Sequence, residues 1–166
     1  MLDATFGFGQ DALLLAFAAG ESGRVTALEG SPLLAGLALE GMPRWATPGD
    51  VVSRRISLRW ADARAFLAQA PDRSFDVVYL DPMFRRPQSA APDFVVLRSL
   101  ARMDPLDETT LAHARRVARR TVVVKDAWPG HELVRLGREP VDRLRRADVV
   151  YGVWSASSGD AAVDQE

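Results

Sequence analysis

The chain has 166 residues, of which 48% are hydrophobic and 26% charged, and this composition is typical of one globular domain with a substantial core. It has no cysteine and only two histidines, which excludes disulfides, cysteine-based zinc sites, a thiol nucleophile and a histidine-rich metal centre. No apolar run approaches the ~18 residues of a membrane span, and the first residues lack the basic region of a secretory signal. We therefore expect a cytoplasmic protein.

The net charge of −1 conceals an uneven distribution. Residues 1–50 carry two arginines against six acidic residues, whereas residues 82–150 carry fourteen basic residues against nine acidic ones. A basic second half is typical of proteins that bind RNA or DNA. Solvated helix faces would produce the same pattern, so charge alone leaves both interpretations open.

Short β-rich segments alternate with longer helical segments along the chain. We expect strands at 1–4, 24–29, 54–60, 75–81 and 121–125. We expect helices between them at 11–19, 32–40, 63–70 and 110–119. This order predicts an α/β fold of the Rossmann-like type, with a mostly parallel, twisted sheet covered by helices on both faces.

Two further β segments, 140–146 and 147–154, predict an antiparallel pair that closes the sheet. We expect one domain over residues 1–154 and a disordered tail over 155–166, because the last dozen residues are small, polar and acidic. Met1 falls inside the first expected strand. We therefore expect either that a native N-terminal region is missing from this chain or that its start was assigned late.

The segment "LDATFGFGQDA" predicts a binding site for a nucleotide-type cofactor. Asp3 ends a strand, and Gly7 and Gly9 form a turn before a helix, where the backbone can approach a ligand. Glu29 ends the second strand, where an acid can accept hydrogen bonds from both hydroxyls of a ribose. These features alone fit both NAD and S-adenosyl-L-methionine (SAM).

Two acidic residues favour SAM. Asp3 precedes the glycines and is placed to meet a charged amino-acid group rather than a pyrophosphate. Asp62 follows the third strand, where it or the nearby backbone could contact an adenine amino group. Asp62 would also serve as the N-cap of a helix from Ala63, and the two roles are compatible.

The segment "YLDPMFRRP" follows the fourth strand and predicts a second site at the same sheet edge. The Asp81 carboxylate and the Pro82 carbonyl could accept both N–H bonds of a base amine and turn its lone pair towards a methyl donor. Phe84 could stack on the base, which is worth roughly 1–3 kcal/mol. Arg85 and Arg86 are placed to meet phosphates. A plain turn with a core aromatic is the alternative interpretation.

Lys125, the only lysine, lies at the end of a strand on the same edge. A contact to phosphate or base and a simple surface strand end are equally consistent with its position. We expect an ordinary loop around Trp128 and His131.

Four motifs together resemble the bacterial small-subunit ribosomal RNA guanine-N2 methyltransferase J family. They are "LDATFGFGQDALLLA", "VTALEGSPLLAGL", "VVYLDPMF" and "RTVVVKDAWPG", in order over about residues 2–128. The resemblance implies a class I SAM-dependent methyltransferase that acts on a guanine amine of ribosomal RNA. It also implies cofactor contacts at Gln10–Asp11, Glu29–Gly30, Asp62–Ala63 and Asp81. Gln10 and Gly30 stand where family members usually carry arginine.

The sequence thus predicts a SAM-dependent methyltransferase for an exocyclic base amine, with RNA as partner and without a metal. Three alternatives remain: a truncated, non-catalytic SAM-binding relative, a methyltransferase for another nucleic-acid or small-molecule amine, and an NAD-dependent oxidoreductase. The oxidoreductase has no evident use for the residues that follow the fourth strand.

Overall fold

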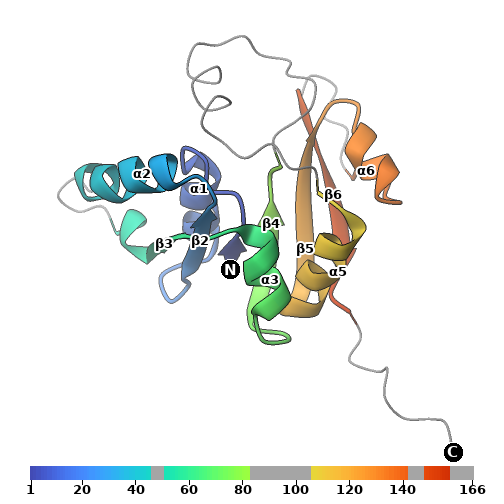
Figure 1. The fold of residues 1–166 in the computed structure, drawn as a ribbon, viewed down its shortest axis with the longest axis horizontal. Helices are drawn as coiled ribbons and strands as arrows, with labels where there is room; N and C mark the ends of the chain where they lie inside the picture. The colour runs from blue at the N-terminus through green and yellow to red at the C-terminus, as the bar shows by residue number, and fades with distance from the viewer. Residues whose placement is uncertain (46–50, 83–105, 142–147, 158–166) are drawn as a thin grey trace, which may run out of the picture.

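A six-stranded sheet forms the centre of the protein (Figure 1), whose computed structural model describes residues 1–45, 51–82, 106–141 and 148–157. The strand order is β3-β2-β1-β4-β5-β6. The strands are β1 (Leu2–Asp3), β2 (Val25–Glu29), β3 (Ile56–Trp60), β4 (Phe75–Leu80), β5 (Ala118–Ala127) and β6 (Val149–Ser155). The first five are parallel, and β6 pairs antiparallel with β5. The predicted mostly parallel sheet with an antiparallel strand at its C-terminal end is confirmed, but β6 pairs with β5, whereas the prediction paired 147–154 with 140–146.

Helices overlap all four predicted helical segments, and one further short helix follows β5. They are α1 (Gln10–Ala18), α2 (Pro32–Trp45), α3 (Ala63–Gln69), α5 (Glu108–Val117) and α6 (His131–Arg135), with a 3-10 turn at Ser53–Arg55. Helix α2 continues past the expected end at Glu40. No helix within the described residues is long and apolar enough to cross a membrane.

Helix α6 corrects the expectation of an ordinary loop at His131. The buried Asp126 carboxylate accepts hydrogen bonds from the backbone N–H groups of Glu132 and Leu133, at 2.8 and 3.3 Å. Gly130, with φ of 93°, provides the left-handed residue before the helix. A carboxylate at a helix N-terminus compensates its unpaired donors, so the last residues of β5 determine where α6 begins.

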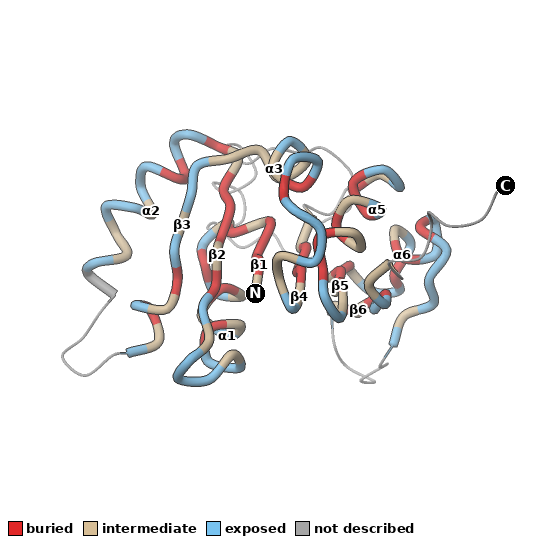
Figure 2. The backbone as a smooth tube through the Cα atoms, turned by 90° about the horizontal axis from the view of Figure 1, so that it is seen from below, coloured by how far each residue is buried: buried red, intermediate tan, exposed pale blue. Residues whose placement is uncertain are grey.

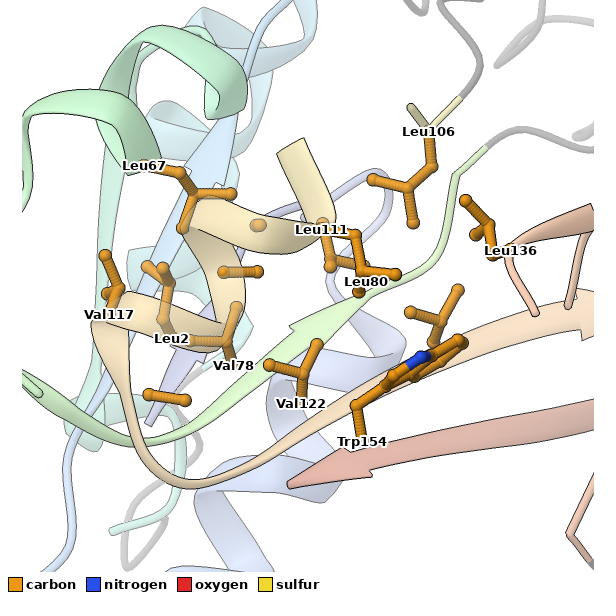
Figure 3. Close-up of a cluster of buried hydrophobic side chains, with 14 of the residues drawn as sticks. Leu2, Leu67, Val78, Leu80, Leu106, Leu111, Val117, Val122, Leu136 and Trp154 are labelled. Carbon is orange, nitrogen blue, oxygen red and sulfur yellow. The ribbon is translucent and has the colours of Figure 1, made fainter. Parts of the chain in front are cut away.

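One face of the sheet packs against α3, α5 and α6. Figure 1 shows α3 and α5 side by side, and Figure 3 shows the cluster beneath them. Its members are apolar residues from the helices and from the strands they cover, among them Leu2, Leu67, Val78, Leu111, Val122, Leu133 and Trp154. The Arg116 guanidinium donates to the carbonyls of Leu67 and Ala70, which fastens α5 to the end of α3.

The other face packs against α1 and α2. Ala12 and Ala16 of α1 lie against Val25 and Ala27 of β2, and small side chains let the helix approach the sheet closely. Figure 2 shows burial concentrated in the central strands, while the outer turns of α2 are exposed. Together the two packed faces hold the ends of the strands in fixed positions.

The C-terminal segments are only partly described. Val141 forms one antiparallel bridge with Tyr151, and the rest of the strand expected at 140–146 lies outside the described residues. The N–H groups of Ala156 and Ser157 donate to the carbonyls of Arg120 and Arg115. The domain boundary at residue 154 and the tail over 155–166 stay predictions.

Candidate functional site

The acidic residues predicted for function follow the carboxyl ends of neighbouring strands. Asp3 pairs with Ala27 and Tyr79 in the parallel register, so β1, β2 and β4 end at the same edge. The N–H of Ala61 donates to the carbonyl of Glu29, which brings the end of β3 to the same edge. Asp3, Glu29, Asp62 and Asp81 therefore share one side of the sheet, where open α/β sheets bind ligands.

Glu29 fixes the glycine turn that precedes α1. Its Oε2 accepts from the N–H of Gly7 at 3.0 Å, and its Oε1 accepts from the N–H of Ser31 at 2.8 Å. Gly7 and Gly9 have φ of 56° and 78°, in the left-handed region that residues other than glycine rarely adopt. The turn therefore leaves backbone close to the end of β1, as a bound cofactor needs.

Asp3 is fully buried, and only one of its two carboxylate oxygens accepts a hydrogen bond. Oδ1 accepts from the N–H of Thr5 at 3.0 Å, whereas Oδ2 is buried without a hydrogen-bond partner. The pKa of Asp3 is raised from 3.8 to about 7, chiefly by burial and also by the negative charges of nearby acids, against the lowering effect of the Thr5 N–H; the acids are Asp11, Asp81 and Glu29. An orphaned acceptor beside a glycine turn is suited to a cationic ligand group.

Asp81 immediately follows β4. Its N–H donates to Oγ1 of Thr5 at 2.6 Å, which ties the backbone after β4 to the segment after β1. Burial raises the pKa of its carboxyl to about 6, because the lowering effect of Lys125 only partly offsets it. Asp81 is therefore ionised at neutral pH and can accept hydrogen bonds.

Lys125 lies between two carboxylates. Its Nζ is 2.9 Å from Oδ2 of Asp81 and 2.9 Å from Oδ2 of Asp11. The hydroxyl of Tyr79 also donates to Oδ2 of Asp11, at 2.8 Å. Burial alone would lower the pKa of Lys125, but the two carboxylates outweigh it and the pKa is raised. The ammonium is therefore charged and links β5 to β4 and α1.

The remaining predicted residues occupy the same edge or lie outside the described residues. Gln10 is exposed at the start of α1, and Gly30 is half-buried directly after β2. The Oδ1 of Asp62 accepts from the N–H of Ala65 at 2.9 Å, so its predicted N-cap role before Ala63 is confirmed. Pro82 is half-buried. The predicted residues Phe84, Arg85 and Arg86 lie outside the part of the chain that the structure describes.

Sequence reasoning missed Thr5 and Tyr79. Alternation along the chain offered a signal for both, because Thr5 stands two positions after Asp3 and Tyr79 two positions before Asp81. Within the described residues, no group of three or more histidine, aspartate or glutamate side chains could hold a metal ion.

The parallel sheet, the glycine turn after β1 and the acid at the end of β2 define a class I Rossmann-like methyltransferase fold. The chain belongs to the family of SAM-dependent methyltransferases: the family model described as "Putative SAM-dependent methyltransferase" matches residues 1–151. Membership in this family makes SAM the cofactor.

Individual relatives agree with this family. The uncharacterized protein YpiP of Bacillus subtilis is 36% identical over 94% of this chain and 62% of its own length. Ribosomal RNA small subunit methyltransferase J of Alkalilimnicola ehrlichii is 33% identical over 96% of this chain and 62% of its own. The methyltransferase J of Aeromonas salmonicida is 37% identical over 75% of this chain and 51% of its own. The chain thus spans 62% or less of these relatives, and the predicted resemblance to methyltransferase J is confirmed.

A solved structure agrees as well. A SAM-dependent methyltransferase from Neisseria gonorrhoeae superimposes with a TM-score of 0.66 at 28% identity, over 96% of this chain and 66% of its own. A SAM-dependent methyltransferase from Aquifex aeolicus, 16% identical with a TM-score of 0.57, shares the fold.

The residues present fit SAM. The unpartnered Oδ2 of Asp3 suits the ammonium of its methionine part, and the turn at Gly7 and Gly9 leaves backbone available beside it. Glu29 already accepts two backbone N–H groups, and carboxylate oxygens have further lone pairs for ribose hydroxyls. Bound there, SAM supplies an electrophilic methyl group.

Proposed function

We propose that this protein transfers a methyl group from SAM to an exocyclic amine of a nucleobase, with guanine N2 of small-subunit ribosomal RNA as the target. The observation that carries the proposal is the ionised Asp81 carboxylate, followed by Pro82, at the sheet edge that carries the glycine turn. The names of the methyltransferase J relatives support ribosomal RNA as the substrate, which would place the protein in the cytoplasm.

The chemistry requires acceptors for the amine. The nitrogen of a base amine is a poor nucleophile, because its lone pair is delocalised into the ring. Oδ1 of Asp81 is the atom we assign to one amine N–H, because Lys125 holds Oδ2. The carbonyl of Pro82 takes the other N–H. Two acceptors would turn the lone pair out of the ring plane and aim it at the methyl group, so the gain is one of orientation and charge placement.

We assign cofactor contacts to the segment from the end of β1 into the first turn of α1. The residues of this segment are Asp3, Gly7, Gly9, Gln10 and Asp11. Glu29, Gly30, Asp62 and Ala63 follow β2 and β3, where we assign the ribose and adenine. For the base and its phosphates we keep the predicted residues Phe84, Arg85 and Arg86. The predicted contact of Lys125 to base or phosphate is replaced, because two carboxylates already hold its ammonium.

Methyl transfer from labelled SAM to isolated small ribosomal subunits or their RNA tests this function. Asp81→Asn keeps the shape of the side chain but removes its charge. It should lower the transfer rate about 100-fold or more while binding of S-adenosylhomocysteine stays measurable. Asp76→Asn is the matched control, because Asp76 is exposed at the start of β4 and pairs with Arg119.

Equal transfer by Asp81→Asn and the wild type would remove Asp81 from the mechanism. Binding of S-adenosylhomocysteine without transfer to any RNA would instead support a non-catalytic SAM-binding relative.

A further inference from the structure

The surroundings of Lys125 differ from those of a lysine at an exposed strand end. Its side chain is 18% exposed, and its ammonium contacts carboxylates from two other elements, Asp81 after β4 and Asp11 in α1. An exposed ion pair contributes little to stability, because solvent screens the attraction between its charges. Here all three side chains are at most 25% exposed, so the charges interact more strongly.

Apart from Lys125, the charged side chains that act on Asp81 within the described part of the chain are acidic. Among the residues that the structure describes, the ionisable groups facing Asp81 are Lys125 of β5, Asp11 of α1, Asp3 of β1 and the Tyr79 phenol of β4. Of these four groups, only Lys125 is a cation. Like charges disfavour ionisation of neighbouring carboxyls, so the ammonium is what offsets burial and the other acids.

Ionisation of Asp81 decides what it can do with an amine. A carboxylate accepts hydrogen bonds at both oxygens, whereas a protonated carboxyl can donate one. A donor would compete for the amine lone pair that must attack the methyl group. An acid that is protonated at neutral pH would therefore oppose the reaction.

We propose that Lys125 is a positioning residue for methyl transfer, whose ammonium keeps Asp81 ionised and fixes Oδ2 so that Oδ1 faces the amine. Through Asp11 the same ammonium couples Asp81 to the first turn of α1, next to the glycine turn. This inference rests on the proposed function of Asp81, and it gives Lys125 a role through another side chain rather than through phosphate.

Two variants of the whole chain separate the charge of Lys125 from its packing. Lys125→Met keeps most of the aliphatic chain and removes the charge, whereas Lys125→Arg keeps the charge. An opposite charge at this distance lowers the pKa of a carboxyl by about 1–3 units. Carboxylate NMR titration should therefore show the Asp81 pKa rising by that amount in Lys125→Met and staying close to the wild-type value in Lys125→Arg.

The same shift should appear in the kinetics. In Lys125→Met the acidic limb of the kcat/KM profile should move to higher pH, so that activity recovers partly in alkaline buffer. A profile lowered by one factor at every pH would show a structural role only and would overturn the inference. So would an unchanged Asp81 pKa in Lys125→Met.

A third variant covers poor folding of Lys125→Met. The double variant Asp11→Asn with Lys125→Met also removes the neighbouring negative charge, and it is compared with Asp11→Asn alone, which keeps Lys125. The Asp81 pKa should be higher in the double variant than in Asp11→Asn, and equal values would contradict the charge argument. The titration needs no substrate. It therefore decides the role of Lys125 even if the wild-type protein transfers no methyl group and the proposed function fails.

Discussion

Asp3 should strengthen cofactor binding and, when ionised, lower the stability of the protein without cofactor. Its native pKa of about 7 lies above the ordinary value of 3.8, so folding favours the protonated form. The contribution of Asp3 to stability is therefore greatest below its unfolded pKa and is lost as pH rises towards 7. A difference of roughly three units corresponds to about 4 kcal/mol at full ionisation.

Asp3→Asn removes this charge from the buried site. The amide still leaves an unsatisfied polar group where Oδ2 has no partner, at a cost of about 1–3 kcal/mol. The net gain should be about 2 kcal/mol at pH 8, which corresponds to a rise of roughly 4–8 °C in Tm for a chain of this size. At pH 4 Asp3 is protonated in the native state, so only the cost of the unsatisfied amide remains, and the variant should be less stable than the wild type by about 1–3 kcal/mol.

Cofactor binding should change in the opposite direction. A hydrogen bond to a charged group contributes about 1.5–3 kcal/mol, so Asp3→Asn should weaken S-adenosylhomocysteine binding about 10- to 100-fold. Thermal melts at both pH values and calorimetry measure the two effects, with Asp76→Asn as the control. A variant that is less stable at pH 8, or that binds the ligand as well as the wild type, would refute the assignment of Asp3 to the cofactor ammonium.

Three further substitutions test the site and its supports. Glu29→Gln should lower S-adenosylhomocysteine affinity about tenfold or more in calorimetry and loosen the turn at Gly7, because the amide loses a charged acceptor; unchanged affinity would contradict its role. Tyr79→Phe should cost about 1.5–3 kcal/mol in denaturant unfolding, since the hydroxyl donates to the Asp11 carboxylate. Asp107→Ala removes the N-cap of α5, whose Oδ1 accepts from Thr110, and should cost about 1 kcal/mol but leave ligand affinity unchanged. A loss of affinity in Asp107→Ala would show that the site is less rigid than the packing implies.

Local patterns were sufficient for much of the fold. The continuous apolar runs of β4 and β5 and the cap at Asp62 each depend on residues close in the chain. Strand β5 is longer than predicted, because Arg119 and Asp126 at its ends obscure the apolar pattern. Helix α6 was missed for another reason: it has only five residues and begins where a buried carboxylate from β5 holds its N-terminus.

The site was predictable only as far as strand order allowed. Parallel strands place Asp3, Glu29 and Asp81 at one edge, which the sequence indicates. The contacts that set their ionisation join distant parts of the chain. The bond from Asp81 to Thr5 spans 76 positions, and that from Lys125 to Asp11 spans 114. No local pattern indicates such pairs.

The position of the transferred methyl group tests the central proposal most directly. Small-subunit ribosomal RNA would be incubated with the protein and SAM that carries a deuterated methyl group, digested to nucleosides and analysed by mass spectrometry. The account predicts label in N2-methylguanosine with the wild-type protein and with Asp76→Asn, and its loss with Asp81→Asn. Label on a base carbon or a ribose oxygen, or equal label with Asp81→Asn, would contradict it.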